Sequence, residues 1–210
     1  MTMSSQGFEG AARDPIVVRA PPAAVRVRRV ARQLFTARGV QAVSVQEIVD
    51  QTGITKPSLY RAFASKNDLA VAWLEDEEAD FWTRFDAVLQ SRPDDPRAGL
   101  IAVFGDLAVQ VQAMTYRGCA ATNAALEFPD ETHPIHVAAK GFKQRLRERL
   151  IRLVGELGAP DRETTAGSLL LVFEGIGVSG QVTSPGDLTR SVTLVVTLIL
   201  AQWDETRSLS

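Results

Sequence analysis

Apolar residues recur mostly at spacings of three and four along this chain, and no stretch shows the sustained alternation of apolar and polar residues that marks a half-buried strand. This pattern predicts an all-α protein. Between residues 27 and 90 it indicates a helix that ends at Gly39, short helices after Ser44 and Thr55, and a long helix after Ser65. Further helices are expected at 97–114, 119–128, 134–156, 161–178 and 186–204.

The starts of the early helices carry specific capping signals. Ser44 and Ser65 are each followed three residues later by an acid, Glu47 and Asp68, which is the spacing of a capping box. Gly53 permits a tight turn between the two short helices, and a tight turn between short helices is typical of a helix-turn-helix. The sequence therefore predicts a DNA-reading module between about residues 27 and 69.

The second short helix has the chemistry that a reading helix needs. Lys56, Ser58 and Arg61 fall on exposed positions, and Pro57 sits in the first turn, where its missing amide costs little. Hydroxyl and amino groups donate to phosphates and base edges, and the free amides of a helix N-terminus favour an anion further. We expect this helix to enter the major groove of DNA.

Charge is distributed unevenly along the chain. Residues 1–62 hold nine Arg and Lys against four acids, a net charge of +5, while the remainder carries −7. A basic N-terminal part on an acidic body indicates a module for polyanions joined to a body that need not touch them.

Composition is that of a soluble globular protein, with 45% apolar and 23% charged residues. A single cysteine, Cys119, excludes an intrachain disulfide framework and a four-cysteine zinc site and favours a reducing cytoplasm. Residues 1–22 are expected to form a flexible tail. The apolar run at 192–201 is too short to span a membrane, so no membrane role is expected.

The sequence from about residue 27 to residue 74 resembles the tetracycline-repressor (TetR) family of bacterial regulators. The resemblance rests on four segments taken together: Leu34-Phe35-Thr36-Ala37-Arg38-Gly39, Val45-Gln46-Glu47-Ile48-Val49, Gly53-Ile54-Thr55-Lys56-Pro57-Ser58-Leu59-Tyr60 and Phe63-Ala64-Ser65-Lys66-Asn67-Asp68-Leu69. By position it implies DNA contacts from Ser44, Thr55, Lys56, Ser58, Tyr60 and Lys66. Ala62 departs from the family, many of whose members have a larger polar or aromatic residue there.

The resemblance implies a cytoplasmic homodimer, usually a repressor that binds a palindromic operator in double-stranded DNA and is released by a small-molecule effector. It divides the chain into a DNA-binding domain at 23–70 and a helical effector-binding and dimerisation domain at 71–210. The last two helices are expected to form the dimer interface. The apolar positions of the last helix cover more than one face, which favours the same interpretation. Ser184 and Pro185 are expected to begin that helix.

Aromatic and polar residues of the body supply candidates for an effector pocket. These are Phe85, Phe104, Tyr116, Cys119, Asn123 and Phe173. Cys119 has two interpretations: a thiol activated by a helix N-terminus and Arg117 that senses electrophiles, or a small buried apolar residue, which is the commoner role of a lone cysteine.

Two signals point to other functions and are weaker. Residues 175–180 fit G-x-G-x-x-G, but a dinucleotide site would need a strand before these glycines and a helix opening at them, so close helix packing is the better interpretation. His133 and His136 do not have the spacing of a zinc site, and no metal or cofactor is expected. The alternative function is a small-molecule-binding enzyme built on the body, but no catalytic constellation supports it, and we expect no enzyme activity.

Overall fold

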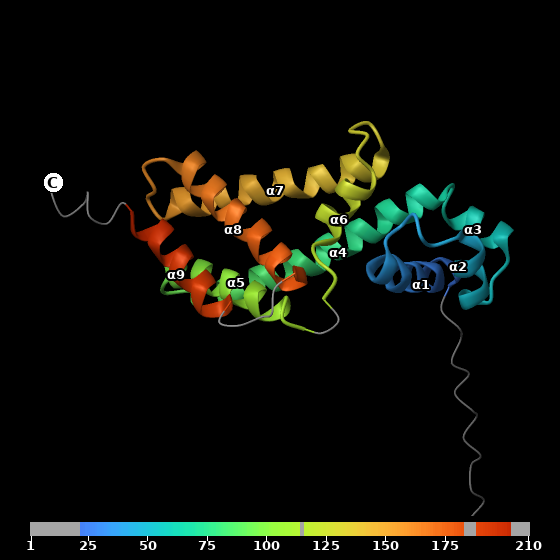
Figure 1. Ribbon diagram of the computed structural model, residues 1–210, viewed down its shortest axis with the longest axis horizontal. Coiled ribbons are helices and arrows are strands. Elements are labelled where there is room, and N and C mark those ends of the chain that lie inside the picture. The colour runs from blue at the N-terminus through green and yellow to red at the C-terminus, as the bar shows by residue number, and fades with distance from the viewer. Residues whose placement is uncertain (1–21, 114–115, 183–187, 203–210) are drawn as a thin grey trace, which may run out of the picture.

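The computed structural model describes residues 22–113, 116–182 and 188–202, and these ranges fold into helices without strands, as the sequence predicts (Figure 1). The helices are α1 (Ala23–Arg38), α2 (Val45–Thr52), α3 (Lys56–Ala62), α4 (Lys66–Gln90), α5 (Pro96–Gln110), α6 (Ala120–Glu127), α7 (Pro134–Glu156), α8 (Arg162–Val182) and α9 (Leu188–Ala201). The expected N-terminal tail, apart from Pro22, and the expected helix start at Ser184 and Pro185 lie outside the described residues.

The early helices begin where the capping signals indicate. The Ser44 Oγ accepts the Glu47 amide at 3.1 Å, and the Ser65 Oγ accepts the Asp68 amide at 3.1 Å. The carboxylate of Glu47 pairs with Arg38 at 2.5 Å instead of completing a capping box. α2 therefore starts with one cap and an ion pair back to the preceding helix.

Two of the expected helix ends are wrong. α5 stops at Gln110, four residues before the expected end, and α8 runs on to Val182 instead of stopping at 178. The helix continues through its glycines, and at Gly180 close packing requires one: a Cβ there would lie 2.5 Å from the Cβ of Val111. The G-x-G-x-x-G match is thus helical throughout and has no preceding strand, which overturns the dinucleotide interpretation.

Figure 1 shows α1, α2 and α3 gathered at one end of the molecule, with α4 running from that end into a body made of α5 to α9. We call α1 to α3 with the first turns of α4 the head, and the remainder the body. In the body α5 packs on α9, α7 packs on α8, and α4 packs on both α5 and α7. Buried apolar residues form one set that extends from head to body, so α4 belongs to both.

Candidate DNA interface and ligand cavity

Helix α3 presents its polar side chains outward and is anchored by one buried residue. Leu59 is fully buried, whereas Lys56, Tyr60 and Arg61 are exposed. The Ser58 hydroxyl receives a hydrogen bond from Arg61 at 2.9 Å and lies 3.0 Å from the Thr55 hydroxyl. This places a cluster of hydrogen-bonding groups and a cation at the N-terminal end of a short exposed helix, which is the arrangement that major-groove reading requires.

The other predicted DNA contacts flank this helix. Ser44 is exposed at the start of α2, outside α3, whereas Pro57 lies in the first turn of α3 itself, as expected. Lys66 opens α4 and is half-buried, and this burial lowers the pKa of its ammonium group, against the attraction of the Glu127 carboxylate, which raises it. Lys66 therefore lies where the head meets the body.

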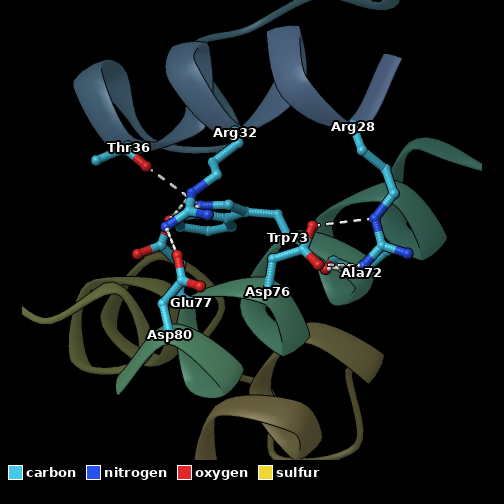
Figure 2. Close-up of polar contacts among 8 residues, drawn as sticks. All are labelled: Arg28, Arg32, Thr36, Ala72, Trp73, Asp76, Glu77 and Asp80. Carbon is cyan, nitrogen blue, oxygen red and sulfur yellow. Dashed lines mark hydrogen bonds and ion pairs between the residues drawn. The ribbon is translucent and has the colours of Figure 1, made fainter. Parts of the chain in front are cut away.

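Two of the N-terminal arginines form ion pairs within the protein. Figure 2 shows Arg28 of α1 paired with Asp76 of α4 at 2.5 Å, and Arg32 paired with Glu77 at 2.8 Å and with Asp80 at 2.6 Å. The excess positive charge of the N-terminal part is thus not all available to DNA. Part of it fastens α1 to α4.

Trp73 of α4 lies in the same joint between α1 and α4 (Figure 2). Its indole N–H lies 3.2 Å from the Thr36 hydroxyl and 3.2 Å from the Glu77 carboxylate, and its ring packs edge-on against Phe35 at 5.7 Å between centroids. Trp73 is almost completely buried. The joint therefore combines apolar packing of the Trp73 ring with hydrogen bonds from its indole N–H.

The body contains a cavity of about 780 Å³, lined mainly by α4, α5, α7 and α8. Four of the predicted pocket residues line it: Phe85, Tyr116, Cys119 and Phe173. Phe104 does not, because its side chain is buried in the core. Asn123 does not either, because its amide is turned to the carbonyl oxygen of Arg117 at 2.7 Å.

Aromatic rings form the apolar wall of the cavity, and Phe81 is at their centre. Its ring lies between 5.1 and 5.8 Å from the rings of Phe85, Phe142 and Phe173. Sequence reasoning did not single out Phe142 for this wall. The spacing of Ala139, Phe142 and Leu146 could have assigned Phe142 to a buried helix face, but not to a cavity.

Cys119 and Tyr116 line the cavity, and Lys143 and Glu174 lie behind them, outside its lining. The Lys143 Nζ lies 3.4 Å from the Cys119 Sγ and pairs with Glu174 at 2.7 Å. The same ammonium group lies 4.5 Å from the centre of the Phe173 ring. Burial, and after it the neighbouring Cys119 and Glu174, raise the pKa of Tyr116 to about 12, so its hydroxyl stays protonated and can donate.

The structure changes the surroundings expected for Cys119 but keeps its expected place at the start of a helix. The cation in contact with its sulfur is Lys143 of α7, not the expected Arg117. The residue is half-buried at the cavity wall and is the N-cap of α6, so it is not a closed core residue either. Because Cys119 lines the cavity, a ligand bound there can reach its thiol.

The histidines serve in local contacts. His133 caps α7 and lies 3.3 Å from the Asn67 amide, and the Nδ1 of His136 lies 2.8 Å from the carbonyl oxygen of Phe128. Among the described residues no group of three His, Cys, Asp or Glu side chains could hold a metal ion.

An apolar face on α8 and α9 is open to solvent in the single chain. Its exposed members are Leu171, Val178, Val182, Leu194, Val195 and Leu198, which we call the α8–α9 face. By length and composition α8 could cross a membrane, and only 28% of its apolar stretch is buried within the chain. An apolar surface of this kind marks an interaction site.

The head and the whole fold both have relatives among known proteins. Residues 27–73 match the family model described as bacterial regulatory proteins, tetR family. A TetR-family transcriptional regulator from Streptomyces coelicolor is 26% identical, with a TM-score of 0.77 over 85% of this chain and 94% of that one. A putative TetR regulator from Streptomyces avermitilis is 25% identical, with a TM-score of 0.70 over 84% and 97%.

The fold is shared more widely than the sequence. The reduced form of Escherichia coli NemR has a TM-score of 0.72 over 84% of this chain and 96% of that one, at 18% identity. A search of curated proteins gave no match.

A short exposed reading helix, a bracing helix before it and a helical body with a cavity define a DNA-binding transcription regulator of the helix-turn-helix class. Within that class, residues 27–73 match the TetR family, and the chain as a whole shares the fold of TetR-family regulators.

Proposed function

We propose that the protein is a dimeric repressor whose two heads bind the half-sites of a palindromic operator and whose body releases the DNA when it binds an effector. The exposed, polar N-terminal end of α3 is the observation that carries the DNA-binding part. The DNA contacts are assigned to Ser44, Thr55, Lys56, Pro57, Ser58, Tyr60, Arg61 and Lys66. The head would extend over residues 23–70 and the body over 71–210.

Pairing of two chains follows from the α8–α9 face. Its exposed leucines and valines would be covered by the same face of a second copy, because a two-fold interface brings identical patches together. The pair then fixes the distance between two reading helices. Successive major grooves on one side of DNA are about 34 Å apart, so a modest change in head spacing breaks the fit of one head.

The effector site in this proposal is the cavity beside Cys119. Its aromatic wall suits a planar or apolar ligand, and the Tyr116 hydroxyl can donate to a carbonyl or an anionic group of that ligand. An effector with an activated carbon–carbon double bond could add to Cys119 at the same place: the sulfur bonds to one carbon, the π bond breaks, and the thiol proton ends on the other carbon. Release of DNA requires that the effector bind more tightly to the conformation whose head spacing does not fit DNA than to the conformation whose spacing does.

Replacing Lys56 by Ala is expected to weaken DNA binding and to reduce the salt dependence of log K by about one phosphate contact, a change of about 0.9 in slope. The measurement is binding to a selected duplex at several salt concentrations. Lys140→Ala, which removes an exposed lysine of the body, serves as the control. An unchanged slope in Lys56→Ala would remove this residue from the interface.

Alkylation provides a separate test of the effector site. Because Cys119 is the only cysteine in the sequence, N-ethylmaleimide should add one label to the native protein within minutes and weaken DNA binding at least tenfold. Cys119→Ser should bind DNA normally and ignore the reagent. Mass spectrometry and a mobility-shift assay follow the two effects. Full labelling with unchanged DNA binding would exclude Cys119 from effector action.

As a DNA-binding regulator the protein would act in the cytoplasm, where bacterial DNA lies, and would catalyse no reaction. The enzyme alternative would need a nucleophile with a positioned base. Cys119 contacts an ammonium group instead, which is a donor and not a base when protonated. Turnover of any metabolite by the purified protein would favour the alternative.

A further inference from the structure

One carboxylate of the body holds the turn between α1 and α2. Glu127, the last residue of α6, accepts the backbone amide of Val40 at 2.9 Å and that of Gln41 through its other oxygen. The side-chain amide of Gln41 donates in return to the carbonyl oxygen of Glu127 at 2.6 Å. Hydrogen bonds to a charged acceptor are the stronger kind, so this contact fixes the turn against the body.

The turn is shaped to receive this carboxylate. Gly39 adopts a φ of +80°, which L residues rarely do, and a Cβ added there would lie 3.0 Å from a carboxylate oxygen of Glu127. The missing side chain at Gly39 therefore leaves room for Glu127. Lys66, a proposed DNA contact, also interacts electrostatically with this carboxylate.

The opposite end of α6 reaches the ligand cavity. Cys119 caps the helix, and Cys119, Ala120 and Ala121 belong to the cavity wall. An eight-residue helix is about 12 Å long, so the two ends are separated by one short rigid element. In Figure 1, α6 lies against α7 and α4, next to the head.

We propose that Glu127 is a positioning residue for DNA binding: it transmits the position of α6, set at the cavity, to the turn that leads into the DNA-binding helices. The proposal rests on the function proposed above and adds the residue through which cavity and head are coupled. A ligand that displaces the Cys119 end of α6 moves the carboxylate at the other end, and the Val40 and Gln41 amides move with it or lose their acceptor. Glu127 itself touches neither ligand nor DNA in this account.

Coupling between two sites is reciprocal, so DNA can replace the unidentified effector in a test. The probe is the full chain with a duplex that it selects from random-sequence DNA, and the readout is the rate at which N-ethylmaleimide labels Cys119. In the wild-type protein the rate with and without DNA should differ by about fivefold or more. In Glu127→Gln the rate without DNA should stay near the wild-type rate, and the ratio should fall to near one.

Glu131→Gln is the matched control, because it neutralises a carboxylate in the next connection that pairs with Lys140 and not with the head. It should keep the wild-type ratio. Hydrogen exchange gives a second, direct readout: in Glu127→Gln the amide of Val40 or Gln41 should exchange about tenfold faster, because a carboxamide can accept from one of them only while its NH₂ faces the other. Gln41→Ala removes one bond without touching the carboxylate and should give an intermediate ratio.

The outcomes separate the two proposals. Failure to select any duplex would overturn the proposed function, and the role of Glu127 would fall with it. A selected duplex whose effect on Cys119 labelling survives in Glu127→Gln would overturn the role of Glu127 alone. The role of Glu127 would also be overturned if amide exchange at Val40 and Gln41 were unchanged in Glu127→Gln. The same holds if DNA did not change the rate of Cys119 labelling in the wild-type protein.

Discussion

Val195→Arg is expected to produce monomers that bind the operator at least a hundredfold more weakly. The side chain of Val195 is 43% exposed in the single chain and lies on the α8–α9 face. An arginine there would be buried without a partner in the dimer, which costs several kcal/mol in each of two symmetry-related positions. A single head makes only half of the operator contacts, so loss of the dimer lowers the affinity for the operator. Light scattering coupled to size exclusion measures the mass.

Leu126→Arg is the control for this substitution. Leu126 is 77% exposed on α6, outside the α8–α9 face, and the same change of chemistry there should leave the oligomeric state unaltered. A Val195→Arg protein that remained a soluble dimer with normal DNA binding would place the interface elsewhere.

Trp73→Ala should lower the free energy of unfolding by about 3–5 kcal/mol, the range for removing a large buried aromatic side chain. The ring is 4% exposed and packs on Phe35, and its N–H bonds link α4 to α1 through Thr36. The loss should affect the head first, because Trp73 joins it to α4. Urea unfolding at a fixed protein concentration measures the change, since a dimer's stability depends on concentration.

Trp73→Phe separates packing from hydrogen bonding. It keeps an aromatic ring in the joint and removes only the N–H donor and the second ring, so it should cost about 1–2 kcal/mol. If Trp73→Ala cost no more than Trp73→Phe, the packing of this residue would not stabilise the joint.

The head could be predicted closely from local signals. The caps at Ser44, Thr55 and Ser65 and the turn at Gly53 act within three or four residues, and local spacing is what a sequence displays directly. Those signals fixed the starts of α2, α3 and α4. Helix ends could be predicted less closely, because glycines that locally indicate a stop lie inside α8, where Gly180 packs on Val111.

The cavity and the joints could be predicted only in part, because they depend on which helices face one another. Periodicity assigns a residue to a buried face but not to a partner, so Phe104 and Phe173 could not be told apart as core and cavity residues. Arg28 pairs with an acid 48 residues away, and Lys143 reaches Cys119 from 24 residues away. No local pattern indicates such pairs.

The central claim is that two heads, held by one dimer, read two half-sites of DNA. The most direct measurement selects duplexes from random-sequence DNA with the full chain and determines the mass of the complex by analytical ultracentrifugation. The account predicts an enriched palindrome with half-site centres about 10 base pairs, or a multiple of one helical turn, apart and an even number of chains on each duplex. No enrichment over the starting pool, or one chain bound to an asymmetric site, would contradict it.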